Sequence, residues 1–575
     1  MRAEDPAPGT HSLVLCHRNR RSKLPTPEQQ RTLPLHAKAV EKLNMEYLYQ
    51  HVLSPSAAAR VKHLLSCLNY DPRAPAELPR PMFRMPAAHA KRMCDIGVFE
   101  DLGKVEDLDL SQYNSMNYFT VHEVRDAGDR LRPICWPLAL LLLSQYRSQH
   151  RLKTVDDYRR LALLGGTAAT FDLAASFWQV PLPKESKLVC VTDDGRVVRM
   201  TRLPYGADVA SEVMHIITSA LAGDPLYCKC AGEAGIPASS FSRDCAVHID
   251  NVFFGGPHGA KRASLFLERC KRANAQLNKE EGNTFSTRQK FVGLKIDLEQ
   301  GTVCLKDGFA KDIITGNSIR TCEDLERAMG KLLYGGAVLG VDWRAYLFLI
   351  KQYRRTLSVC ARDDKEWTRE FKFWRVARQQ FEALLAIVRA NQPVKVLPKV
   401  IDQEIDDPDY IVATDATPTS FGGLLLKPGS LPQAFGANFP ERIDDINLAE
   451  SVAAACVLQR FAEEIGSNRP GQRQSKVLLL VDNTSAISRI ANTDKHGRLD
   501  VDGVAPALRA LAAKHGFSIC VQYIRSQENP ADAVSRMREP DMKLVDDVLT
   551  RARGRFEQRA TLRACGRRAA APVTR

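Results

Sequence analysis

The sequence predicts a multidomain protein of the α+β class. With 575 residues the chain is too long for a single hydrophobic core, so we expect roughly three or four domains. Short apolar runs typical of strands alternate with amphipathic helical patterns between about 80 and 300. By contrast, the stretch 318–400 has helical periodicity almost throughout, and strand-like runs return after it.

We expect five segments in order along the chain. Residues 1–75 form a basic, proline-punctuated arm followed by a helix in "AVEKLNMEYLYQHVL". Residues 76–300 have the mixed strand and helix pattern, and residues 301–405 are helical. Residues 406–538 form a compact α/β unit that contains the strand-like runs "YIVATDA" and "KVLLLVDN". Residues 539–575 are an arginine-rich tail.

The charge balance favours a polyanionic partner. The formal net charge is +14, which bears on binding but says nothing about the fold. Residues 551–575 contain eight Arg and one Glu. Two interpretations of this run stay open, a solvated chain end and a contact with nucleic acid.

Cysteine usage and apolar runs indicate a soluble, intracellular protein. Fifteen Cys follow no regular framework and no signal segment opens the chain, so a reduced compartment is expected, either nucleus or cytoplasm. The apolar run 136–143 is too short to span a bilayer, and we expect no membrane role. A zinc site could be assembled from Cys228, Cys230, Cys245 and His248. A single Cys-x-Cys lacks the paired spacings of zinc ribbons, so we do not expect one.

Four carboxylates lie within apolar, strand-like sequence: Asp172, Asp250, Asp415 and Asp482. Each alone is more often a strand-end or turn residue than a metal ligand. Two carboxylates 4 Å apart repel by about 4 kcal/mol at an effective dielectric constant near 20, so a fold that clusters them needs a cation. Magnesium suits such oxygen ligands, and a pair of ions can hold the attacking and leaving oxygens of a phosphoryl displacement. Clustered acids would therefore indicate nucleotidyl transfer or phosphodiester cleavage.

The surroundings of the first two acids resemble the palm motifs of reverse transcriptases. The matching stretches, in order, are "FDLAASFWQVPL" (171–182), "LPYGADVASEVM" (203–214), "VHIDNVFFGG" (247–256), "QLNKEEGN" (276–283) and "KFVGLKID" (290–297). Upstream, "RMCDIGVFED" and "VRDAGDRLRPICWPL" resemble the fingers of that family, and "CEDLERAMGKLLYGG" resembles the stretch that follows its palm. The resemblance covers about 80–345. It implies a right-hand polymerase with fingers and palm in 76–300 and a helical thumb or connection in 301–405.

This resemblance also implies roles for individual residues. Asp172 and Asp250 would be the catalytic, metal-binding carboxylates, with Asn251 at the third metal position. The positions implied for nucleotide binding are Arg132, Phe177, Tyr205, Gly206 and Lys279. Arg132 would meet the triphosphate and Phe177 would face the sugar 2′ position, favouring deoxynucleotides. Gly206 would let the backbone approach the nucleotide, and Lys279 would protonate the leaving pyrophosphate.

One motif departs from the family pattern. The hairpin tip usually reads Tyr-x-Asp-Asp, whereas here it reads His248, Ile249, Asp250 and Asn251. Asn251 keeps an oxygen but lacks a charge, which leaves two carboxylates rather than three to balance two divalent ions. Our hypothesis is that Asn251 weakens magnesium binding without abolishing synthesis.

The stretch 408–537 resembles the RNase H domain of retroelements. Its four acids appear in order as Asp415 in "VATDATPTSFGGLLL", Glu450 in "INLAESVAAACVL", Asp482 in "LLLVDNTSAI" and Asp532 in "YIRSQENPADAVSR". Their spacing is compatible with a first strand, a helix, a central strand and a late helix that converge on one edge. The resemblance implies an RNase H-like α/β domain in which two metal ions activate water against an RNA strand.

Among reverse transcriptases, "GDRLRPI", "FWQVPL", "GKLLYGG" and "ENPADAVSR" most resemble the DIRS type, including VIPER-like retrotransposons. The implied function is RNA-directed DNA polymerase with ribonuclease H, using two Mg²⁺ ions per active site, with Mn²⁺ as the alternative. Its partners would be an RNA template, a DNA primer, the RNA–DNA hybrid and dNTPs; the oligomeric state stays open. The alternative is a retroelement-derived nucleic-acid-binding or scaffold protein with an impaired polymerase site, which Asn251 and Ser211 favour. A telomerase-like or intron-type polymerase is disfavoured, because that resemblance would not account for the RNase H-like stretch 408–537.

Overall fold

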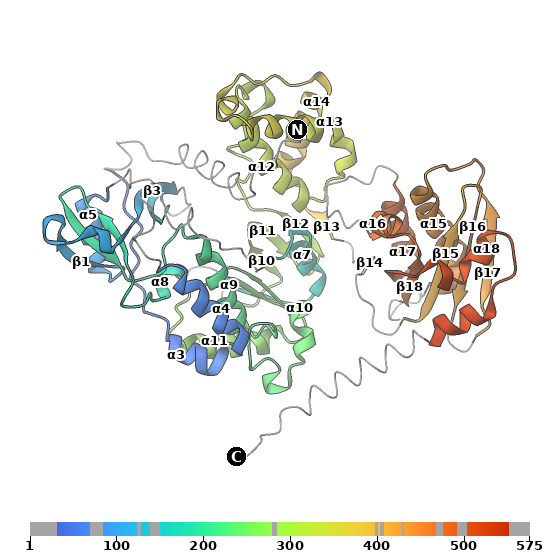
Figure 1. The fold of residues 1–575 in the computed structure, drawn as a ribbon, viewed down its shortest axis with the longest axis horizontal. Helices are drawn as coiled ribbons and strands as arrows, with labels where there is room; N and C mark the ends of the chain where they lie inside the picture. The colour runs from blue at the N-terminus through green and yellow to red at the C-terminus, as the bar shows by residue number, and fades with distance from the viewer. Residues whose placement is uncertain are drawn as a thin grey trace, which may run out of the picture. The chain divides into compact units, whose positions relative to one another are not determined.

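A computed structural model of the chain describes residues 32–69, 84–123, 128–137, 150, 152–278, 284–396, 401–402, 408–427, 430–466, 475–491 and 503–550. The chain divides into two compact units (Figure 1). Unit 1 comprises Met1–Val341 with Phe348–Val396, and unit 2 comprises Asp342–Leu347 with Leu397–Arg575. Both units combine strands and helices, so the chain is a mixed α/β multidomain protein.

After its N-terminal helices, unit 1 contains a small mixed sheet and a two-stranded antiparallel ribbon. A four-stranded sheet has the order β1-β7-β6-β2, with β1 at Phe99–Lys104, β7 at Arg196–Met200, β6 at Leu188–Val191 and β2 at Asn114–Ser115. Strands β3 (Asn117–Glu123) and β4 (Arg130–Trp136) form a separate antiparallel pair. The alternating burial along β4 leaves Arg130 and Arg132 on the half-buried face of the ribbon.

A three-stranded antiparallel sheet lies at the centre of unit 1. Its order is β5-β9-β8, with β5 at Ala169–Asp172, β9 at Asn251–Phe254 and β8 at Cys245–His248. Helices α9 (Asp208–Ala222) and α11 (Gly259–Arg272) pack against it. Helix α9 is buried along nearly its whole length, and its buried residues include the polar Glu212, His215, Thr218 and Ser219.

The described part of the N-terminal segment shares this core. Helix α3 (Met45–Tyr47), the π-helical turn η1 (Leu48–Val52) and helix α4 (Pro55–Ser66) bury Leu48 and Leu64 in the same cluster as the central sheet. Arg60 of α4 also pairs with the buried Glu212 of α9 at 2.7 Å. Residues 40–68, in the expected N-terminal extension, thus pack against α9 and belong to unit 1.

The last part of unit 1 combines a sheet with three helices. The antiparallel sheet has the order β10-β11-β12-β13, with β10 at Arg288–Phe291, β11 at Leu294–Asp297, β12 at Thr302–Leu305 and β13 at Val394–Lys395. Between β12 and β13 run α12 (Cys322–Val338), α13 (Leu347–Cys360) and α14 (Arg375–Ala390). Helix α12 begins with a capping box formed by Thr321 and Asp324. The expected helical segment is thus bounded by strands that pair with each other.

Unit 2 is built on a six-stranded sheet with the order β14-β19-β18-β15-β16-β17. The strands are β14 (Ile401–Asp402), β15 (Tyr410–Ala416), β16 (Ser420–Leu426), β17 (Gln433–Asn438), β18 (Ser475–Val481) and β19 (Phe517–Tyr523). Strands β15, β16 and β17 pair antiparallel, whereas β15, β18, β19 and β14 pair parallel.

Helices cover both faces of this sheet. On one face lie α15 (Ile446–Ile465), α16 (Thr484–Ala491) and α17 (Val504–His515), and Val412 of β15 joins their core. On the other face lie α18 (Ala531–Ser535) and a helix over 542–550, and Ile411 and Ala413 join that core. Successive residues of β15 thus enter opposite cores, as the strand period of two requires. The helix over 542–550 lies beyond the boundary at 538 that we expected for this unit.

The remaining described elements are short: α5 (Ala87–Asp95), η2 (Val105–Asp107), η3 (Leu110–Gln112), α7 (Val155–Arg159), η4 (Arg160–Leu164), α8 (Ser176–Gln179), η5 (Glu233–Gly235), η6 (Ala238–Ser240), α10 (Phe241–Asp244), η7 (Gly316–Ser318), η8 (Trp343–Tyr346), η9 (Asp364–Thr368) and η10 (Ser526–Glu528). Within the described parts of the chain, helices with the length and apolarity to cross a membrane are absent.

Candidate active sites

The central sheet of unit 1 brings three of the predicted metal-binding positions together. Asp172 ends β5 and is paired directly with Asn251, the first residue of β9. Asp250 lies in the two-residue turn between β8 and β9, and its carbonyl accepts a hydrogen bond from the amide of Leu173 at 3.2 Å. The two carboxylates and the carboxamide therefore lie at one end of this sheet.

The turn that carries Asp250 has an unusual backbone. Ile249 has a φ of 57°, in the left-handed region that a β-branched residue rarely adopts. The side chain of Ile249 packs against the core of unit 1, which compensates for the backbone strain. Such strain is concentrated at functional sites, where it fixes the position of a neighbouring group.

Neutral donors satisfy both carboxylates. Asp250 accepts a hydrogen bond from the Ser176 hydroxyl at 2.6 Å and another from Asn251 Nδ2 at 3.0 Å. Asp172 accepts one from Asn278 Nδ2 at 2.6 Å, and Lys38 Nζ donates to the other end of the Asn278 amide at 2.7 Å. Sequence reasoning missed Ser176, Asn278 and Lys38. Ser176 and Asn278 do lie inside the stretches "FDLAASFWQVPL" and "QLNKEEGN", so their position in these stretches was the available signal.

The predicted nucleotide-binding residues surround Tyr205. The rings of Tyr205 and Phe177 meet edge to face with centroids 4.8 Å apart, and the Arg132 guanidinium carbon lies 5.9 Å from the Tyr205 centroid. Burial raises the pKa of Tyr205 well above its usual value, and the nearby charges of Asp250 and Asp172 add to this rise. Tyr205 therefore links the aromatic group to the two acids. Lys279, the remaining residue of this prediction, lies outside the described residues.

Gly206 and Arg132 have specific structural partners. Gly206 has a φ of 112°, and a Cβ added there would lie 3.1 Å from the carbonyl oxygen of Cys135. Glycine is therefore required both by the backbone conformation and by the close approach of β4. Arg132 forms an ion pair with Glu123 at 2.5 Å, and Arg130 binds the same carboxylate at 2.6 Å.

Unit 2 contains a second group of acids. Asp415 of β15, Glu450 of α15 and Asp482, which follows β18, each offer a carboxylate oxygen within 4.8 Å of the other two. Asp415 and Glu450 are only 5% and 4% exposed. Glu450 Oε2 is buried without a hydrogen-bond partner. Three converging oxygen donors, one of them unsatisfied, fit a hard divalent cation.

The raised pKa values of two of these acids also fit a metal site. Burial, together with the charges of Asp482 and Asp415, raises the pKa of Glu450 to about 9. Burial also raises the pKa of Asp415 to about 6, again with help from Asp482. A bound divalent cation would reverse this preference for protons, because it favours the charged forms. The group is therefore a candidate metal site.

Asp532, the fourth predicted acid, is close but not part of the group. It lies on α18 and forms an ion pair with Arg536 at 3.0 Å. Its charge still contributes to the raised pKa of Asp415. Among the described residues, the acids that lie within 4.8 Å of one another are Asp415, Glu450 and Asp482. Ser535, which sequence reasoning missed, donates its hydroxyl hydrogen bond to Asp415.

Two adjacent glycines let helices approach both faces of β16. A Cβ added to Gly422 would lie 2.4 Å from the backbone nitrogen of Ser535 in α18. A Cβ added to Gly423 would lie 2.5 Å from a methyl carbon of Val457 in α15. The pair "GG" in "SFGGLLL" therefore brings α18 and α15, which carry Asp532 and Glu450, close to the sheet that carries Asp415.

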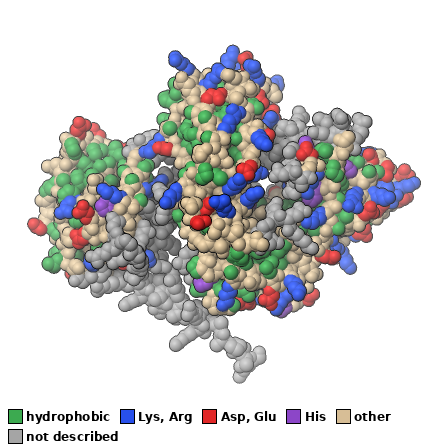
Figure 2. Space-filling view, turned by 180° about the vertical axis from the view of Figure 1, so that it is seen from behind, with side chains coloured by type: hydrophobic (Ala, Val, Ile, Leu, Met, Phe, Trp, Pro, Cys, Tyr) green, Lys and Arg blue, Asp and Glu red, His purple; other side chains and the backbone are tan. Residues whose placement is uncertain are grey.

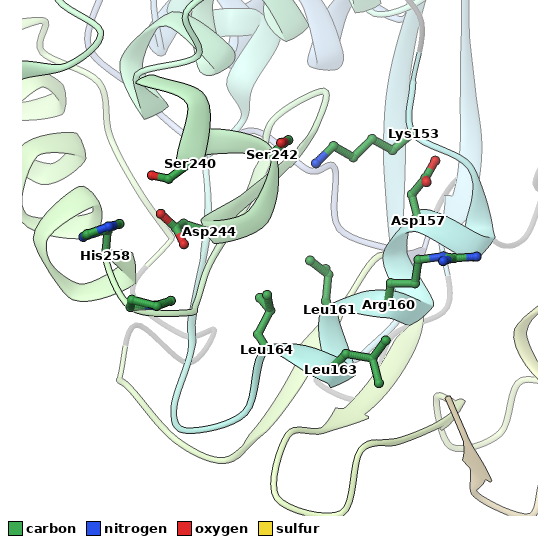
Figure 3. A pocket seen from close by; sticks show the side chains of 11 residues that line it. Lys153, Asp157, Arg160, Leu161, Leu163, Leu164, Ser240, Ser242, Asp244 and His258 are labelled. Atoms are coloured by element: carbon green, nitrogen blue, oxygen red, sulfur yellow. The ribbon is translucent and has the colours of Figure 1, made fainter. Parts of the chain in front are cut away.

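Figure 3 shows a cavity in unit 1. Its volume is about 700 Å³, and its lining includes Lys153, Arg160, Asp244 and His258. Asp244 directly precedes β8, and His258 follows β9. These positions belong to the end of the central sheet opposite Asp250, so the cavity and the carboxylates are separate features.

Comparison with known proteins gives limited similarity. No protein-family model matches the sequence. Over 282 residues, 48% of this chain, the sequence is 24% identical to an enzymatic polyprotein of Carnation etched ring virus. The match spans 37% of the length of that polyprotein.

Solved structures of foamy viral protease-reverse transcriptase are distant matches. The form named dRH, in complex with double-stranded DNA, has a TM-score of 0.41 at 14% identity, covering 87% of this chain and 85% of that chain. The form in complex with an RNA/DNA hybrid has a TM-score of 0.43 at 13% identity, covering 87% and 65%. These scores are too low to assign the fold.

Proposed function

We propose that this chain is an RNA-directed DNA polymerase with ribonuclease H activity, encoded by a retroelement of the DIRS type. The observation that carries the proposal is that each unit gathers acids from distant parts of the sequence into one group. Asp172 and Asp250 meet in unit 1, whereas Asp415, Glu450 and Asp482 meet in unit 2. The partial match to a viral enzymatic polyprotein and the family motifs around these acids support the same assignment.

In the polymerase site, Asp172 and Asp250 would hold two Mg²⁺ ions, or Mn²⁺, with Asn251 as a neutral third ligand. The ions supply positive charge that offsets the developing charge on the phosphates and increases the acidity of the primer hydroxyl. Arg132 would release Glu123 and bind the triphosphate instead. Its planar, permanently charged guanidinium group suits this contact. Phe177, held by Tyr205, blocks a 2′-hydroxyl and so selects dNTPs. Lys279 is proposed to protonate the pyrophosphate.

In the ribonuclease site, Asp415, Glu450, Asp482 and Asp532 would bind divalent cations beside the RNA strand of a hybrid. The order of strands, three antiparallel followed by parallel ones with helices on both faces, supports an RNase H-like domain. Ser535 orients the Asp415 carboxylate through its hydrogen bond. To bind the same cations as the other three acids, Asp532 would have to break its ion pair with Arg536.

The charge and surface chemistry support nucleic-acid partners, namely an RNA template, a DNA primer and their hybrid. The net charge is +14, and Lys and Arg side chains are numerous over the helical part of unit 1 (Figure 2). There Arg355 lies 5.5 Å from the ring centroid of Trp374, and Phe348 is exposed nearby in sequence. On such a surface, aromatic rings can stack on bases and cationic side chains can bind phosphates.

A second candidate function has one specific observation in its favour. Asn251 uses its amide to donate a hydrogen bond to Asp250, whereas an aspartate there could only accept. The amide thus occupies an oxygen that a metal ion would need. This favours a retroelement-derived protein that binds nucleic acid and has an impaired polymerase site.

Two assays on the purified chain separate these functions. Primer extension on an RNA template with dNTPs and Mg²⁺ tests the polymerase, and cleavage of RNA in an RNA–DNA hybrid tests the ribonuclease. We expect Asp172→Asn to abolish only extension and Asp482→Asn to abolish only cleavage. Cleavage without extension by the unmodified chain would select the second candidate. Absence of both activities in Mg²⁺ and in Mn²⁺ would refute the proposal.

A further inference from the structure

Two cysteines of unit 1 lie in contact outside the proposed active sites. Cys228 and Cys230 follow α9, and their sulfur atoms are 3.1 Å apart. Cys228 is 3% exposed, whereas Cys230 is half-buried. Among the described residues this pair belongs to no group of three metal ligands, and His248, once considered as a zinc partner, lies 2.9 Å from the Tyr158 hydroxyl instead. The pair therefore needs an explanation other than zinc.

The surroundings of the pair favour one thiolate. The Cys228 thiol holds the pKa of Cys230 below that of an ordinary thiol, at about 7, and the Arg269 guanidinium contributes in the same direction. Arg269 is fixed by hydrogen bonds to the carbonyl of Leu221 at 3.1 Å and to Glu233 at 3.0 Å. The hydrogen bond that stabilises the Cys230 thiolate and the burial of Cys228 both raise the pKa of the Cys228 thiol. The pair therefore favours a thiolate at Cys230 and a thiol at Cys228.

Among the described residues, the other partly exposed cysteines have raised rather than lowered thiol pKa values. Burial raises the pKa of the thiols of Cys67, Cys94, Cys304 and Cys456 above the ordinary value. All four are half-buried, as Cys230 is. They provide internal controls of similar exposure within the same chain.

We propose that Cys228 and Cys230 form a redox-active dithiol that hydroperoxides oxidise to an intramolecular disulfide. The Cys230 thiolate attacks the terminal peroxide oxygen, the O–O bond breaks, and the other oxygen leaves as hydroxide or alkoxide, which takes up a proton to give water or an alcohol. The resulting sulfenic acid is attacked by the Cys228 sulfur, which loses its proton as one water leaves. The two thiols together supply two electrons, which reduce one hydroperoxide.

The site of disulfide formation lies beside the N-terminal segment. The sulfur–sulfur distance must fall from 3.1 Å to about 2.05 Å, so the two cysteine side chains move toward each other. The Lys229 amide donates to the carbonyl of Val52 at 3.0 Å, and Cys228 forms a β-bridge with Leu53. The dithiol therefore lies in the stretch of chain that contacts the N-terminal helices.

The first test compares rates within the reduced full-length chain. At pH 7 we expect iodoacetamide to label Cys230 about five times faster than Cys67 or Cys94, since a larger thiolate fraction outweighs its lower nucleophilicity. Hydrogen peroxide is then added in steps, and a glutamyl protease that cleaves after Glu212 and Glu233 leaves both cysteines in one peptide. We expect that peptide to lose two hydrogens and to regain them with a reductant. Labelling of Cys230 at the rate of Cys67, or failure of the peptide to lose two hydrogens, would refute the proposal.

Three variants assign the roles of the two sulfurs. Cys228→Ser should leave a sulfenic acid at Cys230 that dimedone traps, and Cys230→Ser should abolish the peroxide reaction of this peptide. Cys94→Ser is the matched control and should change neither result. A peptide that reacts equally in Cys230→Ser would overturn the assigned order of attack and, with it, the proposal. None of these readouts depends on polymerase or ribonuclease activity.

Discussion

Asp415 and Gly422 are directly opposite each other in the paired strands β15 and β16. The backbone of α18 packs so closely against Gly422 that a Cβ there would lie 2.4 Å from the backbone nitrogen of Ser535. The absence of a side chain at Gly422 therefore sets the distance between Asp415 and the helix that carries Asp532. The geometry of the proposed ribonuclease site thus depends on a residue that has no side chain.

Gly422→Ala should displace α18, because the added methyl group would lie 2.4 Å from backbone atoms that cannot rotate away. We expect RNA cleavage in the hybrid to fall at least about tenfold and unit 2 to lose about 1–3 kcal/mol of unfolding free energy. Primer extension should be unchanged. Gly330→Ala is the control, since the space around that position in α12 is open. Full cleavage activity in Gly422→Ala would contradict this positioning role.

The stability of unit 2 without metal should fall as pH rises. Glu450, with its pKa raised to about 9, binds a proton more tightly when folded than when unfolded. The stabilisation is complete below the unfolded pKa and is lost as pH rises through the folded one, by up to about 1.4 kcal/mol per pH unit for one proton. Chemical denaturation between pH 5 and 9 measures this. Glu450→Gln should flatten the profile, and Mg²⁺ should oppose the loss; a flat profile in the unmodified chain would contradict the assignment.

Asn251→Asp should strengthen magnesium binding in unit 1. The substitution replaces a hydrogen-bond donor to Asp250 with a third carboxylate, which increases the attraction for divalent ions. We expect the Mg²⁺ concentration for half-maximal primer extension to fall by about tenfold, equivalent to about 1.4 kcal/mol. The preference for Mn²⁺ over Mg²⁺ should fall as well. Equal activity and equal metal preference in the two proteins would refute the hypothesis about Asn251.

Phe177→Ala should relax the selection of the sugar. Removing the ring that packs on Tyr205 opens space where the family places the 2′ position. We expect the ratio of kcat/KM for dNTP over rNTP to fall by tenfold or more, about 1.4 kcal/mol or more of discrimination. Phe177→Tyr is the conservative control and should keep the ratio. Unchanged selectivity in Phe177→Ala would mean that another residue excludes ribonucleotides.

Removal of residues 551–575 should weaken nucleic-acid binding and its dependence on salt. The segment contains eight Arg and one Glu and lies outside the described residues. Each phosphate contact that is lost removes about one unit from the slope of log affinity against log salt concentration. Fluorescence anisotropy of a labelled hybrid at several salt concentrations measures the slope. The same slope in both proteins would show that the tail makes no phosphate contacts.

Sequence reasoning identified the acids because a carboxylate inside an apolar strand is conspicuous. Asp172, Asp250, Asp415 and Asp482 were singled out in this way, and their roles as metal ligands stay predictions. The structure pairs Asp172 with Asn251, next to Asp250, and brings Asp415 within 4.8 Å of Asp482. Ser176, Asn278 and Ser535 could not be found in this way, because common polar residues gain their roles only through contacts made in the fold. The role of Gly422 likewise depends on the approach of α18 to β16, which no local pattern encodes.

The packing of the N-terminal segment was missed for a different reason. Its helical pattern was visible in the sequence, but the partner of its apolar face is α9, far along the chain. Local periodicity reports that a face will be buried and not what will cover it. The cavity near Asp244 was equally invisible, because its lining comes from three separate stretches of unit 1.

The pairing of β12 with β13 closes a long loop of chain that contains α12, α13 and α14. Thr302 lies opposite Lys395, so the chain leaves the sheet and returns to it at neighbouring positions. Helix α12 also packs against α7, and Asp342–Leu347, between α12 and α13, belong to unit 2. Deletion of the three helices with a short linker from β12 to β13 would therefore also remove contacts of α7 and a segment of unit 2, so the contribution of these helices has to be measured by substitutions within them.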